Sequence, residues 1–468
     1  MPPPQRFDRA IVDGPLLPAV WKIAWPSMLQ NVIGGLQGVI DHILVGRLVG
    51  FVANAAIGVS WQIFLVVIVF LSSLFTGMAI LVSRFAGAGE PEKVNRVVYQ
   101  ALLTAVFLAT VVLAPLGYAS APFLLRLINA APEVQAEALP FLRTMMLCNI
   151  GLMLFFMLSA ALRAAGDAKT PLRLGILMTT LNAALNVVFI RGLGPIPAFG
   201  TMGAALGTSI AGMTVGAVGL WLLFSGRSVV RLERTMSFAP DWTIIRSLFR
   251  FGLPTGFQGI AMNIAGVLLL RFIGSLPDSA AAQGAYAVGY TELFSFITWT
   301  SVALMGATSV VTGQNLGAKQ PERAVRGVEV TSRIGLAVAA GIGLAFLAMP
   351  RALLSIFGMT DPTVLEIGSQ LLRFLSLSGL FVTVALAYTG ALQGTGDTKG
   401  PLYISIVSQM ILPLGLCAFW QANGLLTPTA IWSSIVVGHF SRCALSVLRF
   451  RQGKWRSIVV DIEPSPAG

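Results

Sequence analysis

The chain has 468 residues, of which 56 % are hydrophobic and 11 % charged, and its mean hydropathy is +0.81. These values exclude an ordinary soluble domain of this length and indicate a polytopic membrane protein. The net charge of +12 gathers on segments expected to face the cytoplasm, so the positive-inside rule accounts for it without nucleic acid as a partner. The three cysteines fall inside predicted spans, which argues against disulfides and against a zinc site.

In chain order, the sequence holds twelve apolar runs long enough to cross a hydrocarbon core of about 30 Å. The first run is a full span without a small-residue cleavage site, so no removable signal peptide is expected. Residues 122–132 are too short to span and are expected to form a short helix at the membrane surface. The predicted spans are residues 21–45, 54–81, 97–117, 139–161, 172–190, 202–224, 250–273, 283–310, 334–350, 368–391, 401–420 and 428–448.

The first span carries a carboxylate, Asp41, at a place where ionisable side chains are costly. At 3.6 residues per turn, Gln30, Gly34 and Gln37 lie on the same face as Asp41, so this face is polar and small. An ionisable group inside a span indicates a functional site, because its charge state can change. The alternative interpretation is an Asp that bonds nearby amide or backbone groups and only holds helices together.

Two loop sequences recur at one offset along the chain. GAGEPEKVNR at 87–96 returns as GAKQPERAVR at 317–326, and LRAAGDAKTPL at 162–172 returns as LQGTGDTKGPL at 392–402, both 230 residues later. Two matches at one offset indicate a tandem duplication of a six-span unit. We expect an N-terminal segment at residues 1–20, a first lobe at 21–224, a linker at 225–249, a second lobe at 250–448 and a tail at 449–468.

The predicted fold is an all-α polytopic membrane protein with twelve transmembrane helices in two six-helix bundles. Because six is even, both bundles cross the membrane in the same sense and are related by a pseudo-two-fold axis along the membrane normal. Such parallel repeats suit alternating access, in which two bundles rock about a central site. A scaffold or receptor without transport activity is an alternative, and it would tolerate Asp41→Asn.

Four stretches, in this order and spacing, carry a family resemblance: Val45-Gly46-Arg47-Leu48, the Gly-Ala loop at 87–88, LRAAGDAKTPL at 162–172 and Gly203-Ala204-Ala205. Over roughly residues 18 to 448 the chain resembles the multidrug and toxic compound extrusion (MATE) family. The resemblance implies an efflux antiporter that expels organic, often cationic, compounds by using an inward proton or sodium gradient. The family is similar in fold to lipid-linked oligosaccharide flippases, so an exporter of a lipid-linked or amphiphilic metabolite is the second candidate.

The resemblance implies a coupling-ion site in the first lobe. Asp41 falls on the acidic position of span one that, in the DinF-like branch, is proposed to bind the coupling ion. In span five the family pattern Asn-x-x-x-Asp reads Asn182 to Asn186 here, so the first amide is kept and the acid is replaced. The acids of the NorM-like branch fall near Met262 and Val382, neither of which is acidic, and this favours the DinF-like branch.

The chemistry of these residues favours proton coupling. A carboxylate that faces two amides and a hydroxyl, for which Thr179 is a candidate, could bind and release a proton in exchange for substrate. Sodium would prefer several oxygens with more negative charge, which the loss of the second acid does not provide. The alternative for Asn182 and Asn186 is an interhelical hydrogen bond in a packed lobe.

Candidate substrate contacts lie in both lobes. Glu292 is the other intramembrane acid, and it is a candidate either for contact with substrate or for a second protonation site. Trp299 lies on its helical face, so this pair could attract an organic cation. His42 and His439 are interpreted as packing or hydrogen-bonded residues, although a histidine can titrate near neutral pH. Nothing has the spacing of a P-loop, a metal site or a nucleophile with its base, so no catalytic residue, metal or cofactor is predicted. Three further residues expected in the substrate cleft are amides: Gln30, Gln37 and Gln258.

We therefore predict a monomeric antiporter, not an enzyme, in the cell inner (plasma) membrane with both termini in the cytoplasm. Asp41 would alternate between protonated and ionised forms, with Asn182 and Asn186 as its hydrogen-bond partners. The predicted partners are organic small molecules, protons, with sodium as the less favoured ion, and membrane lipids.

Overall fold

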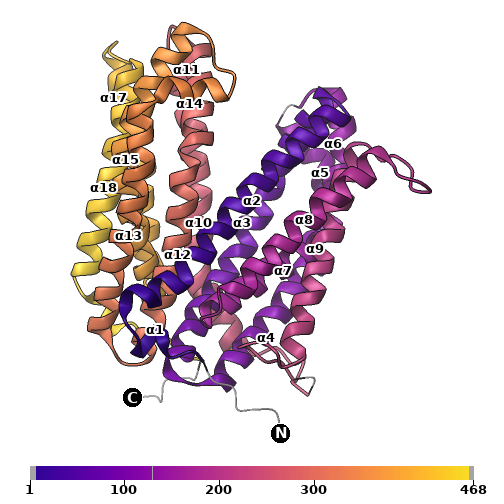
Figure 1. Ribbon diagram of the computed structural model, residues 1–468, viewed down its shortest axis with the longest axis vertical. Helices are drawn as coiled ribbons and strands as arrows, with labels where there is room; N and C mark the ends of the chain where they lie inside the picture. The colour runs from indigo at the N-terminus through magenta and orange to yellow at the C-terminus, as the bar shows by residue number, and fades with distance from the viewer. Residues whose placement is uncertain (1–6, 129, 234, 463–468) are drawn as a thin grey trace. The chain divides into compact units, whose positions relative to one another are not determined.

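The computed structural model describes residues 7–128, 130–233 and 235–462, and in these residues the regular structure is helical apart from one isolated bridge between Leu193 and Ile196 (Figure 1). Ten helical runs are long and apolar enough to cross a membrane, and the bent pair α6–α7 makes an eleventh. α2 (Leu16–Leu48) also has the length to span, but its amide, Asp and His side chains lower its mean hydropathy. With α2, the described helices give the twelve predicted spans.

Contacts between residues divide the chain into two compact units. The first is built around residues 29–253, and the second around residues 254–460 together with 10–28. The helices of the first unit are the later part of α2, α3 (Phe51–Ala88), α4 (Pro91–Phe107), the π-helical segment η1 (Leu108–Leu113), α5 (Ala114–Leu127), α6 (Pro132–Leu147), α7 (Asn149–Ala164), α8 (Lys169–Arg191), α9 (Thr201–Phe224) and the beginning of α10 (Trp242–Gly274).

The second unit repeats this arrangement and adds short helices at its ends. It contains two further π-helical segments, which interrupt long helices. Its elements are α1 (Ala10–Asp13), the start of α2, the later part of α10, α11 (Ser279–Tyr286), η2 (Ala287–Leu293), α12 (Ser295–Gly317), α13 (Pro321–Ala348), α14 (Pro350–Ile356), α15 (Pro362–Thr395), α16 (Lys399–Ser405), η3 (Ile406–Ile411), α17 (Leu412–Ala422), α18 (Pro428–Arg451) and the 3₁₀ turn η4 (Lys454–Ser457).

Two long helices contribute residues to both units. α2 changes unit between residues 28 and 29, shortly after Pro26, and α10 changes unit between residues 253 and 254, at Pro254. The two prolines lie at equivalent places in the sequence repeat. A proline inside a helix removes one backbone hydrogen bond, so each helix is weakened close to the place where it passes from one unit to the other.

Close contacts hold the early part of each of these helices in its unit. In the first unit, the start of α10 packs on α3, where a Cβ added to Gly77 would lie 2.1 Å from the Leu248 carbonyl oxygen. In the second unit, the Asn315 amide donates to the Ile11 carbonyl (3.5 Å) and the Arg323 guanidinium donates to the Gly14 carbonyl. The segments before Pro26 and Pro254 are therefore packed parts of the units that contain them.

Some helices differ in extent from the predicted spans. α10 begins at Trp242, so part of the stretch expected to be linker is helical. The separate surface helix expected at residues 122–132 is wrong, because α5 continues the third span through Pro122 to Leu127. Ala121 and Leu125 are buried in the unit, so these apolar residues extend a packed helix.

The recurrent loops fold into the same turn in both units. Gly89 has φ of 76°, its N–H donates to the Ala86 carbonyl and the Glu90 N–H donates to the Phe85 carbonyl. At the equivalent place 230 residues later, Lys319 has φ of 60° and the same two bonds form at Lys319 and Gln320. These are helix ends closed by a residue in the left-handed conformation, which glycine adopts most readily.

Replacing Lys319 by Gly should stabilise the protein by about 1 kcal/mol, because the left-handed conformation costs a side chain with a Cβ about that much. The midpoint of thermal unfolding in detergent would report the gain. Gly89→Ala is the matched reciprocal variant and should lower stability by a similar amount. A neutral or destabilising Lys319→Gly would mean that the lysine side chain offsets the backbone cost.

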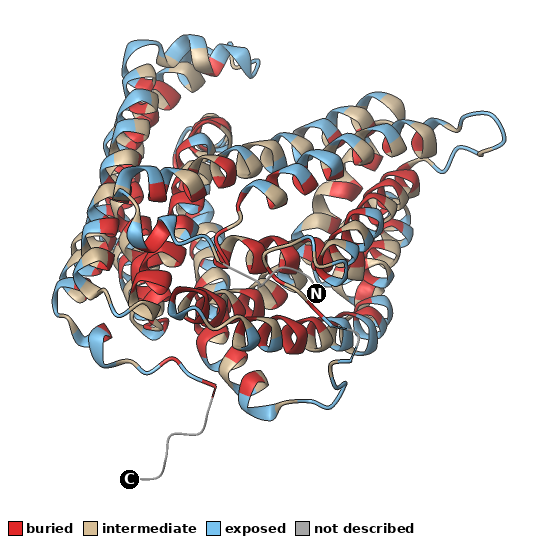
Figure 2. Cartoon of the chain, turned by 60° about the horizontal axis from the view of Figure 1, so that its bottom comes forward, coloured by how far each residue is buried: buried red, intermediate tan, exposed pale blue. Residues whose placement is uncertain are grey.

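Burial follows the helix faces in each unit. Buried positions recur along the helices, and the loops are largely exposed (Figure 2). Many large apolar side chains are nevertheless exposed on the spans, among them Val66, Val267 and Leu344. On a soluble monomer such surfaces would be unusual, whereas a spanning helix presents them to lipid.

Candidate functional site

Asp41 lies buried in the first unit, with 5 % of its surface exposed. The Asn186 side-chain amide, from α8, donates a hydrogen bond of 2.8 Å to Asp41 Oδ1. In the described part of the chain no Lys, Arg or His forms an ion pair with this carboxylate. Burying a carboxylate without a counter-charge makes its charge state depend strongly on whether water or a cation can reach it.

The hydrogen bonds continue from Asp41 into the unit. Asn186 Nδ2 lies 3.4 Å from Asn182 Oδ1, and Asn182 Nδ2 donates to the Thr208 hydroxyl of α9 at 2.9 Å. Asn182 and Asn186 are fully buried, because they lie one helical turn apart on the inner face of α8. The structure thus brings together the three residues Asp41, Asn182 and Asn186 in one chain of hydrogen bonds that ends at Thr208.

Gly207 provides the space for this cluster. A Cβ added to Gly207 would lie 2.1 Å from Asn186 Oδ1, so any larger residue would displace the amide. The Asn186 Oδ1 atom is buried and has no hydrogen-bond partner among the described residues. A buried acceptor of this kind next to a carboxylate is available to a proton-bearing or cationic ligand.

The remaining amides of the α2 polar face also bond to neighbouring helices. Gln37 Oε1 accepts a hydrogen bond of 2.9 Å from the Thr179 hydroxyl, and Gln30 Oε1 accepts one of 3.3 Å from the Arg163 guanidinium. Thr179 therefore bonds to Gln37, and the hydroxyl that joins the Asp41 cluster is that of Thr208. Gln30 and Gln37 are half-buried in the first unit, where they fasten α2 to α7 and α8.

Most of the other candidate residues have partners of their own. His42 Nδ1 is 2.6 Å from Asn54 Oδ1, so the histidine bonds α2 to α3. In the second unit, Gln258 is buried and donates to the Ser405 hydroxyl at 2.8 Å. Glu292 is half-buried in η2, and Trp299 packs edge-on against Phe296 with ring centroids 5.6 Å apart.

Thr208 and Gly207 were not predicted as site residues. The sequence does hold a signal for them, because Gly203 and Gly207 are spaced to let α9 approach another helix closely. In the structure a Cβ on Gly203 would lie 2.4 Å from the Phe189 carbonyl oxygen, which places α9 directly on α8. Spacing alone, however, does not say which helix is approached. Among the described residues no group of three or more His, Cys, Asp or Glu side chains could hold a metal ion.

A family model described as MatE matches residues 26–188 and 254–419, well over half of the chain. The chain belongs to the MatE family. This confirms the family resemblance found in the sequence, and the two matched segments of the MatE chain correspond to its two repeats. Asp41, Asn182 and Asn186 lie in the first segment, and Gln258, Glu292 and Trp299 lie in the second. The protein is a multi-pass membrane transporter.

Curated relatives of this MatE protein match it over nearly their whole length. A Thermotoga maritima protein named "Probable multidrug resistance protein NorM" is 26 % identical over 446 residues, which are 94 % of this chain and 93 % of the relative. A Bacillus subtilis protein named "Uncharacterized transporter YisQ" is 23 % identical over 439 residues, which are 93 % of this chain and 94 % of the relative. Placement of the chain in the DinF-like branch stays a prediction.

Solved structures share the fold of this MatE chain. A multidrug resistance MATE family transporter of the MOP superfamily in an outward-facing conformation aligns with a TM-score of 0.88 at 20 % identity, covering 96 % of this chain and 98 % of that one. A MOP superfamily transporter from Pyrococcus furiosus aligns with the same TM-score, identity and coverage. The all-helical two-lobe fold predicted from the repeat is thereby confirmed.

Proposed function

We propose that this MatE protein is a secondary active antiporter that exports organic, often cationic, compounds by alternating access and is driven by inward proton flow. Asp41 would bind and release the coupling proton, with Asn182 and Asn186 holding the carboxylate. The contact of 2.8 Å between the Asn186 amide and the buried Asp41 carboxylate is the observation that carries this proposal. Several relatives are named multidrug resistance proteins, and these names support organic compounds as the substrate class.

Proton coupling is preferred to sodium coupling because of the ligands available. The amide of Asn186 bonds Asp41, the amide of Asn182 follows it, and the Thr208 hydroxyl bonds Asn182, so the cluster contains one carboxylate among neutral groups. A sodium ion favours several oxygen ligands with more negative charge, whereas a proton needs one basic oxygen and partners that can rearrange their hydrogen bonds. We place sodium second for this reason.

Substrate would contact residues of both lobes. Glu292, Trp299 and Gln258 in the second lobe, with Gln30 and Gln37 in the first, would contact substrate. We propose residues 21–224 and 250–448 as the two lobes and a monomer in the inner (plasma) membrane, surrounded by lipid, with both termini in the cytoplasm. The family's bacterial relatives and the basic loops support this membrane and orientation.

Reconstitution into proteoliposomes tests the coupling ion directly. A fluorescent organic cation is loaded into the vesicles, and its movement is followed under a proton gradient alone or a sodium gradient alone at equal ionic strength. We expect transport under the proton gradient and none above the empty-vesicle control under sodium. Sodium-driven transport would overturn the proposed coupling, and no transport under either gradient would favour a lipid-linked or amphiphilic substrate.

A further inference from the structure

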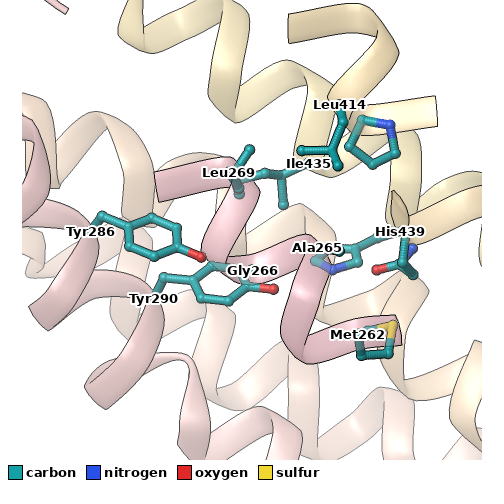
Figure 3. Close-up of a pocket in the computed structure, with 11 residues that line it drawn as sticks. Met262, Ala265, Gly266, Leu269, Tyr286, Tyr290, Leu414, Ile435 and His439 are labelled. Carbon is teal, nitrogen blue, oxygen red and sulfur yellow. The ribbon is translucent and has the colours of Figure 1, made fainter. Parts of the chain in front are cut away.

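The second unit contains a cavity of about 120 Å³ that none of the proposed coupling residues lines (Figure 3). It lies between α10, α11 and η2 on one side and η3, α17 and α18 on the other. Two of its walls come from π-helical segments, because η2 supplies Tyr290 and η3 supplies Gln409. Such segments are frequent at functional sites, since they turn side chains away from the regular helical face. The lining residues are Met262, Ala265, Gly266, Leu269, Tyr286, Tyr290, Gln409, Pro413, Leu414, Ile435 and His439.

Stacked aromatic rings give the cavity flat walls. Tyr286 and Tyr290 are stacked with ring centroids 4.9 Å apart and planes within 8°, and Trp432 continues the stack behind Tyr286 at 6.2 Å. Figure 3 shows the two tyrosine rings side by side, with both hydroxyls turned toward α10 near Gly266. Gly266 leaves this space open, since a Cβ built on it would meet nothing within 4 Å. The two tyrosine rings leave no room between them, so a planar ligand ring would pack against the side of the stack that faces the cavity.

Buried polar groups around the cavity have no partner among the described residues. His439 is 4 % exposed, and its Nδ1 atom has no hydrogen bond. Nε1 of Trp432 and Nε of Arg442, which follows His439 by about one helical turn on α18, also lack a partner in the described part of the chain, but of these three residues only His439 belongs to the lining. Native proteins rarely leave a buried polar atom unpaired, and a ligand in the cavity is one way to satisfy Nδ1 of His439.

The charges around the cavity favour an anion. Arg442 is 7 % exposed and close enough to both Tyr290 and His439 to interact with them electrostatically. No Asp or Glu belongs to the lining. Arg442 does not line the cavity, but a buried guanidinium near two of its lining residues attracts a negative group there and repels a positive one, and the low dielectric of the interior strengthens both effects.

We propose that this cavity is a binding site for a small aromatic carboxylate with a single ring. The ring would lie against Tyr286 and Tyr290, and the carboxylate would accept hydrogen bonds from the tyrosine hydroxyls and His439 in the field of Arg442. The volume of about 120 Å³ limits the ligand to a single ring, since an apolar cavity of about 150 Å³ accommodates benzene.

Three probes of nearly the same shape separate charge from shape. Benzoate is an anion, benzamide is neutral and benzamidinium is a cation, and each has one planar ring. Equilibrium dialysis with the full-length protein in lipid nanodiscs should show that benzoate binds most tightly, benzamide more weakly and benzamidinium weakest of all. Equal binding of the three probes, preference for benzamidinium, or no binding of benzoate at millimolar concentration would overturn the proposal.

Variants locate the binding within the cavity. Tyr290→Phe keeps the stacked ring and removes the hydroxyl, and it should weaken benzoate about tenfold or more, as the loss of a hydrogen bond to a charged group does. Arg442→Gln should reduce the preference for benzoate over benzamide. Tyr403→Phe, on the exposed face of α16, is the matched control and should bind as wild type does. Unchanged benzoate binding in Tyr290→Phe would contradict the assignment, even if Arg442→Gln failed to fold.

This site does not depend on the coupling role proposed for Asp41. Asp41→Asn should therefore leave the affinity for benzoate unchanged, because Asp41 belongs to the first unit and the cavity residues belong to the second. A loss of benzoate binding in Asp41→Asn would contradict that independence. Failure of proton-driven transport with intact benzoate binding would count against the coupling proposal alone.

Discussion

Replacing Asp41 by Asn should abolish proton-driven efflux from proteoliposomes while the protein stays folded. Asn has nearly the shape of Asp and still offers an oxygen to the Asn186 amide, so the hydrogen bond seen at 2.8 Å can persist. The amide cannot bind and release a proton in the range in which the protein is folded. The rate of dye movement after a proton gradient is imposed measures the effect, and thermal unfolding verifies the fold.

Two further variants show whether the effect comes from the hydrogen-bonded cluster. Asp167→Asn is the matched control, because Asp167 belongs to the same unit but accepts from the Lys169 and Thr170 N–H groups in a loop; it should transport as wild type does. Gly207→Ala should slow proton-driven efflux roughly tenfold or more, because it displaces the Asn186 amide, and a hydrogen bond to a charged group contributes about 1.5–3 kcal/mol. Full efflux by Asp41→Asn would contradict the coupling role and direct attention to Glu292.

A methyl group added at Gly390 should destabilise the second unit by about 3 kcal/mol. Gly390 and Gly394 lie one turn apart on α15, where an added Cβ would be 2.0 Å from the Met305 carbonyl oxygen and 2.3 Å from that of Ser309. These obstacles are backbone atoms of α12, so no side chain can rotate to make room. The two helices would have to separate, with loss of packing along their interface.

Gly341→Ala is the control for that substitution. Gly341 lies on α13, and an added Cβ there meets nothing within 4 Å, so the change should be neutral or slightly stabilising. The midpoint of thermal unfolding of the purified protein compares the two variants. Equal midpoints for Gly390→Ala and Gly341→Ala would show that α12 and α15 can move apart at little cost.

The helices and the two repeated turns could be predicted because their signals are local. Apolar runs of span length and the recurrent loops around Gly89 and Gly166 each determine structure within a few residues. The residue type of Lys319 does not indicate the left-handed conformation, since lysine disfavours it, and only the position of Lys319 opposite Gly89 in the repeat does so. The extent of α5 beyond Pro122 was not predicted, because the burial of Leu125 depends on helices that are distant in the sequence.

The site residues that could be predicted are those whose polar or ionisable side chains are energetically unfavourable inside a membrane span. An acid or a pair of amides inside a span is unusual enough to single out Asp41, Asn182 and Asn186 before their contacts are known. Thr208 carries no such cost, and only the packing of α9 on α8 joins it to the cluster. The second-unit cavity was not predictable, since tyrosines and His439 are ordinary residues until π-helical turns and α18 bring them together.

The change of unit within α2 and α10 bears on how the protein is made and how it arose. Residues 10–28 are synthesised before residues 29–253, yet the unit in which they pack is assembled from residues 254–460, so this segment must wait while the core of the first unit is translated. In each unit, the segment before the proline comes from the first helix of the other repeat. A single six-helix repeat on its own would lack that segment. An ancestral protein of one repeat could satisfy its packing by exchanging this segment with a second copy, as a domain-swapped dimer. Gene fusion would then have turned an exchange between chains into one within a chain.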